Sequence, residues 1–302
     1  MIKRHFDKGE LLNYKEREPN LINYENKEIF IHLNSFCLGD TICFVSFLDH
    51  FVELYNPSKL IVSTFQHHLF ESTNPKIEFV NANQKKTIIA DKLINVGYDK
   101  EDLNHTLGGM FYATKDTMFL PQDLKPGNIP VKPKERIVNP KKICIAPEST
   151  KNIAKWDYFG SYGWQEVVDY LVNEGYEVYN VSYENTMNLK NVKGYHGFDD
   201  INVSLNHILE SKIFIGLSSG LAWLSWAYNV PVVMISNFTK PHNEFDCYRV
   251  DNPFSCSGCF NILPNIKTKC PLFLGTLREN ECHRRISPET VIKKIKEALS
   301  DN

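Results

Sequence analysis

The chain has 302 residues, 42% of them hydrophobic and 12% aromatic, and a formal net charge of -2. This length suits two domains with separate cores better than a single core. The near-neutral charge gives no general reason to expect nucleic acid or a membrane surface as a partner. The longest apolar runs, 213–217 and 230–235, have the length of strands and are too short to span a bilayer. No leader sequence is evident, so we expect a cytoplasmic protein.

Strands and helices alternate along the chain, after a polar, weakly patterned segment at 1–26 that we expect to be a peripheral arm. In the first half, the patterns predict a strand at 29–34, a helix at 40–55 and strands at 60–63, 77–80 and 92–96. In the second half, they predict strands at 143–146, 177–182, 213–216 and 232–235, and helices at 163–174, 201–210, 221–228 and 288–299. Such alternation is typical of parallel sheets covered by helices on both faces.

A proline-rich segment separates the two halves. Residues 120–142 carry five prolines with lysines between them, a composition that continues neither a helix nor a central strand. The sequence therefore predicts an α/β protein with two Rossmann-like domains, 1–135 and 136–302. The active site is expected in a cleft between them, at the carboxyl ends of strands.

Four cysteines lie close together near the C-terminus: Cys256, Cys259, Cys270 and Cys282. A Cys-x-x-Cys pair brings two sulfurs to one ion from a single turn, and two further thiols complete a tetrahedron. This favours a structural metal site in an insert at 254–285, whereas free or paired thiols are the alternative. Four thiolates accept both zinc and iron, so the spacing does not choose the metal. His283 is a weaker candidate ligand.

The first candidate loop, 34–41, joins the first strand to its helix. Leu38 and Gly39 precede Asp40 and Thr41, and the glycine permits close approach of the backbone. Asp40 is expected at the start of the helix, facing the cleft. Aspartate is also a favoured N-cap residue, so capping alone could explain it.

The second candidate loop, 147–156, follows the first strand of the second half. Its hydroxyls, including that of Thr150, and Lys155 could hold phosphate oxygens, because an ammonium offsets their charge. A solvated polar loop is the alternative. Glu184, just beyond the strand at 177–182, could accept hydrogen bonds from a ribose or could be an ordinary surface glutamate. The aromatic residues at 156–164 could form a stacking surface or pack in the core.

The third candidate loop is a Ser-Ser-Gly turn after the strand at 213–216. Ser218, Ser219, Gly220 and Leu221 lead into a helix, whose first turn offers free backbone N–H groups to a diphosphate. The alternative is an N-cap formed by one of the serines. The turn is not a Walker loop and lacks the full dinucleotide glycine pattern.

These motifs together resemble a known family. The run 216–227 is similar to the donor-phosphate turn of the lipopolysaccharide heptosyltransferases, 38–42 to their Gly-Asp element, and 155–156 to their lysine-containing donor segment. With the run 233–245 and the four cysteines added, the chain looks like the bacterial autotransporter heptosyltransferases. These are protein O-heptosyltransferases that transfer heptose from ADP-heptose to serines of a surface protein.

The resemblance implies a GT-B fold and an inverting transfer to a Ser or Thr hydroxyl of an acceptor protein, with Asp40 as general base. Lys155, Thr150, Glu184 and the turn at 218–221 would bind the donor, and Leu38, Gly39 and Thr41 would form an acceptor-side loop. It implies a structural iron in the cysteine insert, with zinc as the alternative, and no catalytic divalent metal. It also implies a surface or autotransporter-type acceptor protein and a possible homo-oligomer.

Two other functions stay open. One is a related glycosyltransferase that uses a different nucleotide sugar or a glycan acceptor. The other is a non-catalytic, metal-stabilised protein-binding scaffold. One departure from the family is its additional N-terminal domain: only 28 residues precede the first expected strand here.

Overall fold

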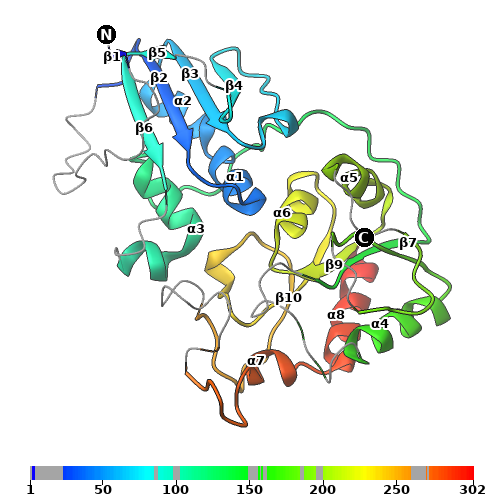
Figure 1. Cartoon of the computed structure of the whole chain (residues 1–302). Coiled ribbons are helices and arrows are strands. Elements are labelled where there is room, and N and C mark those ends of the chain that lie inside the picture. The colour runs from blue at the N-terminus through cyan, green and yellow to red at the C-terminus, as the bar shows by residue number, and fades with distance from the viewer. Residues whose placement is uncertain are drawn as a thin grey trace. The chain divides into compact units, whose positions relative to one another are not determined.

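The structure of the protein is a computed structural model. It describes residues 2–3, 23–84, 88–97, 103–148, 156, 158, 162–183, 187–194, 200–259, 270 and 272–302. The chain divides into two compact units, Met1–Pro133 and Lys134–Asn302. Each unit has its own parallel sheet with helices packed on it (Figure 1). The α/β prediction is confirmed. The donor and acceptor roles of the two halves, and a cleft between them, stay predictions.

The first unit is built on a parallel sheet of order β4-β3-β2-β6. Phe30 of the central strand β2 lies opposite Ile61 and Leu93 of its neighbours, so apolar residues fill the middle of the sheet. The elements of this unit are β1 (Ile2–Lys3), β2 (Glu28–Leu33), α1 (Leu38–Val45), α2 (Leu48–Tyr55), β3 (Lys59–Thr64), η2 (His67–Leu69), β4 (Ile77–Asn81), β5 (Ile89–Ala90), β6 (Lys92–Val96) and α3 (Leu103–Thr117).

The helix predicted at 40–55 is in fact two helices. It begins at Leu38 and breaks at Ser46 and Phe47, between α1 and α2. The Ser46 hydroxyl donates to the carbonyl of Cys43 at 2.7 Å, and the Ser46 carbonyl accepts from the amide of Gly127 at 2.8 Å. Serine side chains compete with the helical ladder in this way, and the carbonyl is already used by a distant segment. The break therefore depends on a tertiary contact.

Two features of the first unit were not predicted. Helix α3 is kinked at Gly109, which has φ of 78°, and its apolar spacing is too weak to reveal it from the sequence. Near the N-terminus, β1 pairs antiparallel with β5, and Tyr24 is buried with its ring 5.5 Å from that of Phe51. The described parts of 1–26 thus pack on the unit.

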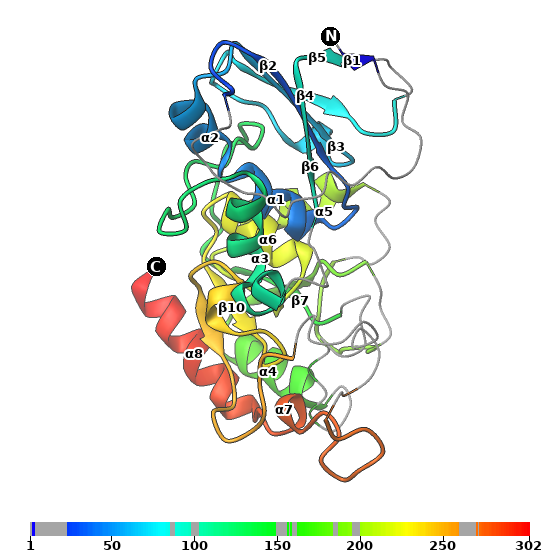
Figure 2. The ribbon, with the colours of Figure 1, turned by 90° about the vertical axis from the view of Figure 1, so that its left-hand side faces the viewer.

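The second unit contains a parallel sheet of order β11-β10-β9-β7-β8. Helices α4 and α8 lie side by side on one face, and α5 and α6 lie on the other (Figures 1 and 2). The elements are β7 (Lys142–Ala146), α4 (Tyr162–Asn173), β8 (Glu177–Asn180), α5 (Ile201–Glu210), β9 (Phe214–Leu217), α6 (Gly220–Ala227), β10 (Val232–Ile235), η4 (Pro241–Asn243), β11 (Tyr248–Val250), α7 (Glu281–Arg284) and α8 (Pro288–Asp301). Strand β11, only three residues long, was not predicted.

The core of the second unit follows from helical spacing. Helix α4 buries Trp164, Val167, Val168 and Leu171, which recur at i, i+3, i+4 and i+7 and so form one face. Helix α8 starts as predicted, because Pro288 occupies its first turn and the Ser287 side chain accepts from the amide of Thr290. Both apolar faces pack on the sheet in one core, α4 against β8 and α8 against β10 and β11.

Residues 120–141 of the proline-rich segment form neither a helix nor a named strand, as predicted, and each part is attached to one unit. Its first part belongs to the first unit: the amide of Lys132 donates to the carbonyl of Leu69 at 2.9 Å. Its second part belongs to the second unit: the amide of Asn139 donates to the carbonyl of Glu210 at 2.8 Å. The segment is therefore held along its length by backbone hydrogen bonds.

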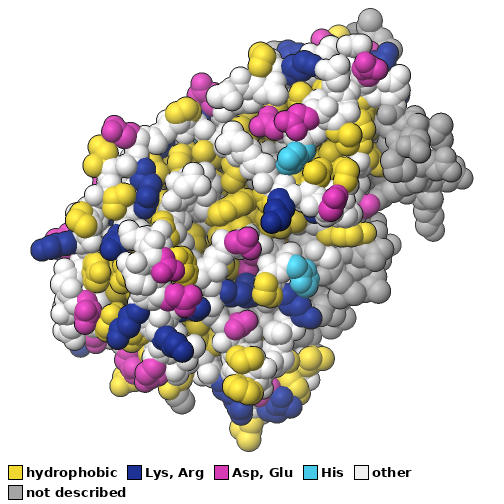
Figure 3. All heavy atoms as spheres, turned by 180° about the vertical axis from the view of Figure 1, so that it is seen from behind, with side chains coloured by type: hydrophobic (Ala, Val, Ile, Leu, Met, Phe, Trp, Pro, Cys, Tyr) yellow, Lys and Arg dark blue, Asp and Glu magenta, His cyan; other side chains and the backbone are white. Residues whose placement is uncertain are grey.

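The described surface carries both signs of charge. On the face shown in Figure 3, lysine and arginine side chains are interspersed with acidic ones and do not gather into one basic area, in keeping with the small net charge. Among the described helices, none combines the length and apolar character needed to cross a bilayer.

Candidate functional site

Each sheet has a point at which the strand order changes direction. In the first unit it lies at β2, between β3 and β6, and in the second unit at β7, between β8 and β9. Ligands of open α/β sheets bind outside the carboxyl ends of strands at such points. The loop before Asp40 follows β2, and the Ser-Ser-Gly turn follows β9. Both candidate loops therefore begin where the topology favours a ligand.

Asp40 is not the N-cap of its helix. The N-cap is Cys37, which makes no side-chain capping bond, and Asp40 lies in the first turn of α1. The hydroxyl of Ser35 donates to Oδ2 of Asp40 at 2.6 Å and accepts from the amide of Cys37 at 3.1 Å. The capping interpretation is therefore wrong. The loop holds the carboxylate through Ser35, which sequence reasoning missed, and an ionised carboxylate has more than one acceptor site for hydrogen bonds.

The other residues of this loop have structural contacts. Gly39 and Thr41 are buried, and the Thr41 hydroxyl donates to the carbonyl of Cys37 at 3.2 Å. Leu38 is the first residue of α1 and is half-buried. Of the predicted acceptor-side residues, Thr41 thus has its hydroxyl occupied inside the helix.

Phe36 of this loop is an exposed aromatic residue that stacks on half-buried Phe65. The side chain of Phe36 is 71% exposed, and its ring stacks on that of Phe65 with centroids 3.9 Å apart and planes 22° apart. The side chain of Gln66 donates to the carbonyl of Phe36. Large exposed aromatic rings are typical of recognition surfaces. Sequence reasoning did not single out Phe36, because its partner is 29 residues away.

In the second unit, the Ser-Ser-Gly turn leads directly into α6. Ser219 is the N-cap by backbone geometry, but its side chain makes no capping bond, and its Oγ is buried without a partner among the described residues. Within the same described part, the amides of Gly220 and Leu221 have no hydrogen-bond acceptor. Free amides at a helix N-terminus attract anions. Ser219 therefore occupies the N-cap position that the alternative predicted, but without a side-chain capping bond.

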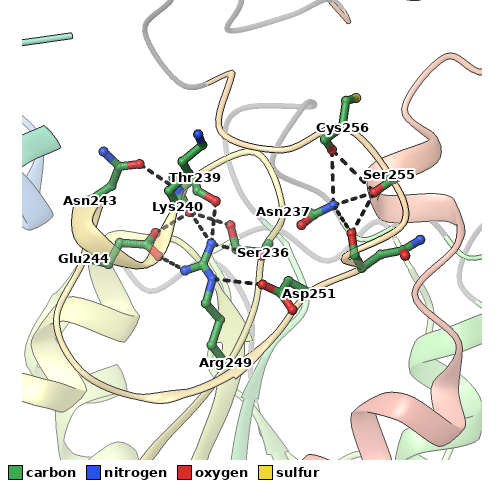
Figure 4. A network of polar contacts seen from close by, with 11 residues as sticks. Ser236, Asn237, Thr239, Lys240, Asn243, Glu244, Arg249, Asp251, Ser255 and Cys256 are labelled. Carbon is green, nitrogen blue, oxygen red and sulfur yellow. Dashed lines mark hydrogen bonds and ion pairs between the residues drawn. The ribbon is translucent and has the colours of Figure 1, made fainter. Parts of the chain in front are cut away.

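The hydroxyl of Ser218, in contrast, already donates a hydrogen bond within the protein. It donates to Oε1 of Glu244, a carboxylate that is only 2% exposed and that forms an ion pair with Arg249. Arg249 also donates to the carbonyls of Ser236 and Thr239 at 3.1 and 2.6 Å (Figure 4). Glu244 and Arg249 were not predicted. Glu244 falls in the run 233–245 that contributed to the family resemblance, but nothing in its spacing indicates the contact.

Three predicted donor residues, Thr150, Lys155 and Glu184, lie outside the described residues. Their neighbour Trp156 is described and is fully buried. Its indole N–H donates to the carbonyl of Ile286 at 2.9 Å, and its ring meets that of Trp164 edge-on at 5.3 Å. These two tryptophans belong to the core, so the core interpretation holds for them and the stacking surface does not.

The four clustered cysteines are all free thiols. Burial, followed by the other three thiols, raises the pKa of Cys282 to about 12, and burial with two of them raises that of Cys259 to about 11. Nearby thiols therefore add to the effect of burial on these two cysteines. Even so, within the described ranges no group of three or more His, Cys, Asp or Glu residues has a metal-binding arrangement. The four cysteines are close in sequence, but their described side chains do not form a metal-binding group in this structure.

The turn between the first two cysteines suits a ligand pair. Gly258 has φ of 72°, a left-handed conformation that glycine adopts without strain. Its amide donates to the carbonyl of Asn237 at 3.0 Å, and a Cβ there would collide with side-chain carbons of Lys240. Cys256 and Cys259 thus flank a tight turn at Gly258, and two thiols on one such turn are the ligand pair that a structural metal site uses.

Comparison with known proteins finds autotransporter heptosyltransferases among the proteins similar to this chain. No family model matches it. The autotransporter heptosyltransferase Aah of Escherichia coli is 27% identical over 300 residues, an alignment that covers 90% of this chain and 74% of Aah. The inactive autotransporter heptosyltransferase BimC of Burkholderia thailandensis is 32% identical over 170 residues, which cover 51% of this chain and 39% of BimC. The chain is a homologue of the autotransporter heptosyltransferases.

The fold agrees with that relationship. The iron-containing dodecameric glycosyltransferase TibC of enterotoxigenic E. coli superimposes with a TM-score of 0.79 at 24% identity, covering 93% of this chain and 78% of TibC. A second TibC structure contains ADP-D-beta-D-heptose. The E. coli ADP-heptose lipopolysaccharide heptosyltransferase II superimposes with a TM-score of 0.59 at 12% identity, covering 91% of this chain and 99% of that one. The predicted resemblance to the autotransporter heptosyltransferases is confirmed and supports glycosyltransferase activity, whereas with the lipopolysaccharide heptosyltransferase the chain shares the fold.

Proposed function

We propose that the chain is an inverting glycosyltransferase that moves heptose from ADP-heptose to a Ser or Thr hydroxyl of an acceptor protein. The observation that carries the proposal is the homology to Aah, which extends over 90% of the chain. The complex of TibC with ADP-D-beta-D-heptose supports the choice of donor. The free amides of the turn before α6 support a diphosphate in the second unit.

In the proposed reaction, Asp40 acts as general base. Its carboxylate takes the proton from the acceptor hydroxyl as that oxygen bonds to the anomeric carbon of heptose. The bond from the anomeric carbon to the diphosphate breaks, and ADP leaves with the electron pair. The amides of Gly220 and Leu221 would stabilise the charge that develops on the diphosphate. Lys155, Thr150 and Glu184 keep their predicted donor-binding roles as part of this proposal.

The acceptor is proposed to be a surface or autotransporter-type protein, modified in the cytoplasm. The exposed ring of Phe36, in the loop that holds Asp40, supports contact with an acceptor on this side of the first unit. Because TibC is dodecameric, a homo-oligomer is part of the proposal.

A structural metal completes the proposal. Cys256, Cys259, Cys270 and Cys282 would hold it, as iron by analogy with iron-containing TibC or as zinc. Bound there, the metal would supply folding energy to the insert, and no catalytic divalent metal is expected.

The function is tested with a panel of nucleotide sugars. We expect ADP alone to raise the Tm of the protein and ADP-heptose to be consumed, slowly with water and faster with an acceptor, as followed by mass spectrometry. Asp40→Asn should lower transfer about 100-fold to 10,000-fold, the usual contribution of a general base, while ADP binding persists. Asp49→Asn, a change in the first turn of α2, is the matched control.

The alternatives give different results. A preference for UDP-, GDP- or CMP-linked sugars would indicate a related transferase with another donor, and transfer only to oligosaccharides would indicate a glycan acceptor. No response to any nucleotide sugar would favour the non-catalytic scaffold, which BimC makes relevant because that homologue is described as inactive.

A further inference from the structure

A buried ion pair, Glu244 with Arg249, contacts the candidate diphosphate turn through Ser218. Glu244 follows the short helix η4 and is buried, and both of its carboxylate oxygens have partners. Oε1 accepts from the hydroxyls of Ser218 and Thr239, the latter at 3.0 Å, and Oε2 is paired with Arg249. An ionised carboxylate accepts and never donates, so the proton in the contact with Ser218 belongs to the serine.

This arrangement fixes what Ser218 can do. Its one hydroxyl proton points to Glu244, so the hydroxyl cannot at the same time donate to a phosphate oxygen. The groups left to meet a diphosphate are the amides of Gly220 and Leu221 and the buried hydroxyl of Ser219. Ser218 is therefore an anchor of the turn and not one of its anion ligands.

The ion pair also reduces the repulsion between the Glu244 carboxylate and a bound diphosphate. A lone carboxylate beside a diphosphate would repel it strongly in a buried setting. Arg249 balances that charge and is itself fixed by the carbonyls of Ser236 and Thr239 (Figure 4). Arg249 also lies 3.9 Å from the exposed carboxylate of Asp251, but only Glu244 is buried with it, and that buried pair holds the turn without net charge.

The loop that carries Glu244 is fixed at its other end as well. The side-chain amide of Asn237 donates to Ser255 Oγ at 2.6 Å and to the carbonyl of Cys256 at 3.3 Å (Figure 4). At the end near Glu244, the side chain of Asn243 accepts from the amide of Lys240 at 2.7 Å. The loop at 236–244 is therefore held between the cysteine segment and the Ser-Ser-Gly turn, which leaves Glu244 little freedom to move.

We propose that Glu244 is a positioning residue for donor binding: through the hydroxyl of Ser218 it orients the turn whose amides receive the diphosphate. This inference rests on the proposed function, because it assumes that the turn binds ADP. The effect reaches the ligand only through Ser218, which gives it a measurable signature. Once the serine hydroxyl is removed, Glu244 can no longer orient the turn, so replacing Glu244 as well should cause no further loss of affinity for ADP.

The test is a double-mutant cycle with ADP as the probe and isothermal titration calorimetry as the readout. The variants are Ser218→Ala, Glu244→Gln and the combination of both. We expect each single change to weaken ADP binding roughly tenfold, as for loss of a hydrogen bond to a charged group. The combined variant should bind ADP no more weakly than the weaker single variant.

Two controls separate positioning from folding. Ser218→Thr keeps the hydroxyl and should bind ADP like the wild type, even if Glu244→Gln lowers the Tm by leaving Arg249 unpaired. Glu210→Gln removes the partner of Lys142, another cation with a buried side chain in the same unit, and should leave the affinity for ADP unchanged.

The outcomes are distinguishable. Additive losses in the combined variant, or single variants that bind ADP like the wild type, would overturn the positioning role while the proposed function stands. If the wild-type protein does not bind ADP at all, the proposed function fails, and this inference fails with it.

Discussion

His32 shows how burial of one side chain produces a pH-dependent stability. It lies on β2, with Nδ1 3.2 Å from the hydroxyl of Ser63, and burial lowers its pKa below the usual 6.5. The folded protein therefore favours the neutral ring. Below pH 6.5 the unfolded chain takes up a proton that the folded chain resists, so the free energy of unfolding falls as pH falls through that value.

We predict that His32→Gln makes the stability less sensitive to acid. The loss of unfolding free energy between pH 7 and pH 5 should be smaller in the variant, by at most about 1.4 kcal/mol per pH unit. Urea denaturation at the two pH values measures it. His68→Gln, a change at an exposed neighbouring position, is the control. An equal loss of stability in wild type and His32→Gln would contradict the prediction.

At the scale of elements, the segment from Cys256 to Cys282 differs from the rest of the second unit. Its described exposed residues include large apolar side chains, those of Leu272, Leu274 and Leu277, at 67%, 53% and 103% exposure. A segment with little apolar burial of its own needs another source of stability, and a metal bound by four thiolates supplies one.

We therefore predict that Cys256→Ser and Cys259→Ser release the metal and lower the Tm. Metal content per chain, measured by inductively coupled plasma mass spectrometry, should fall in both variants, and iron and zinc are measured together. Cys37→Ser, which alters an exposed cysteine outside the segment, should retain the metal. Full retention of the metal in Cys256→Ser and Cys259→Ser would contradict the four-thiolate site.

At the scale of the whole molecule, the two units carry different parts of the proposed reaction. Asp40 belongs to the first unit and the Ser-Ser-Gly turn to the second. Each unit has its own sheet, with its candidate loop at the point where the strand order changes. Donor binding and proton transfer should therefore be separable by experiment.

Hydrogen exchange measures that separation. We predict that ADP slows amide exchange most in the second unit, at 217–224, because those amides meet the diphosphate. Asp40→Asn should show the same ADP-dependent protection as the wild type. Protection confined to the first unit would contradict the assignment of the donor to the second.

Local patterns in the sequence were sufficient for much of the fold and for the position of the candidate loops. The alternation of strands and helices, the prolines at 120–142 and the glycine turn before α6 are set by residues close in sequence. Helix α3 and strand β11 escaped prediction because one contains a glycine kink and the other has only three residues.

The sequence by itself determined the α/β class, the alternating elements and the cysteine spacing, because periodicity and ligand spacing are local properties. Only the tertiary structure decided which polar groups are free to act. It assigned the proton of Ser218 to a carboxylate 26 residues away and divided a predicted helix through the amide of Gly127. The free energy of such contacts depends on burial and on partners distant in sequence, which no local pattern contains.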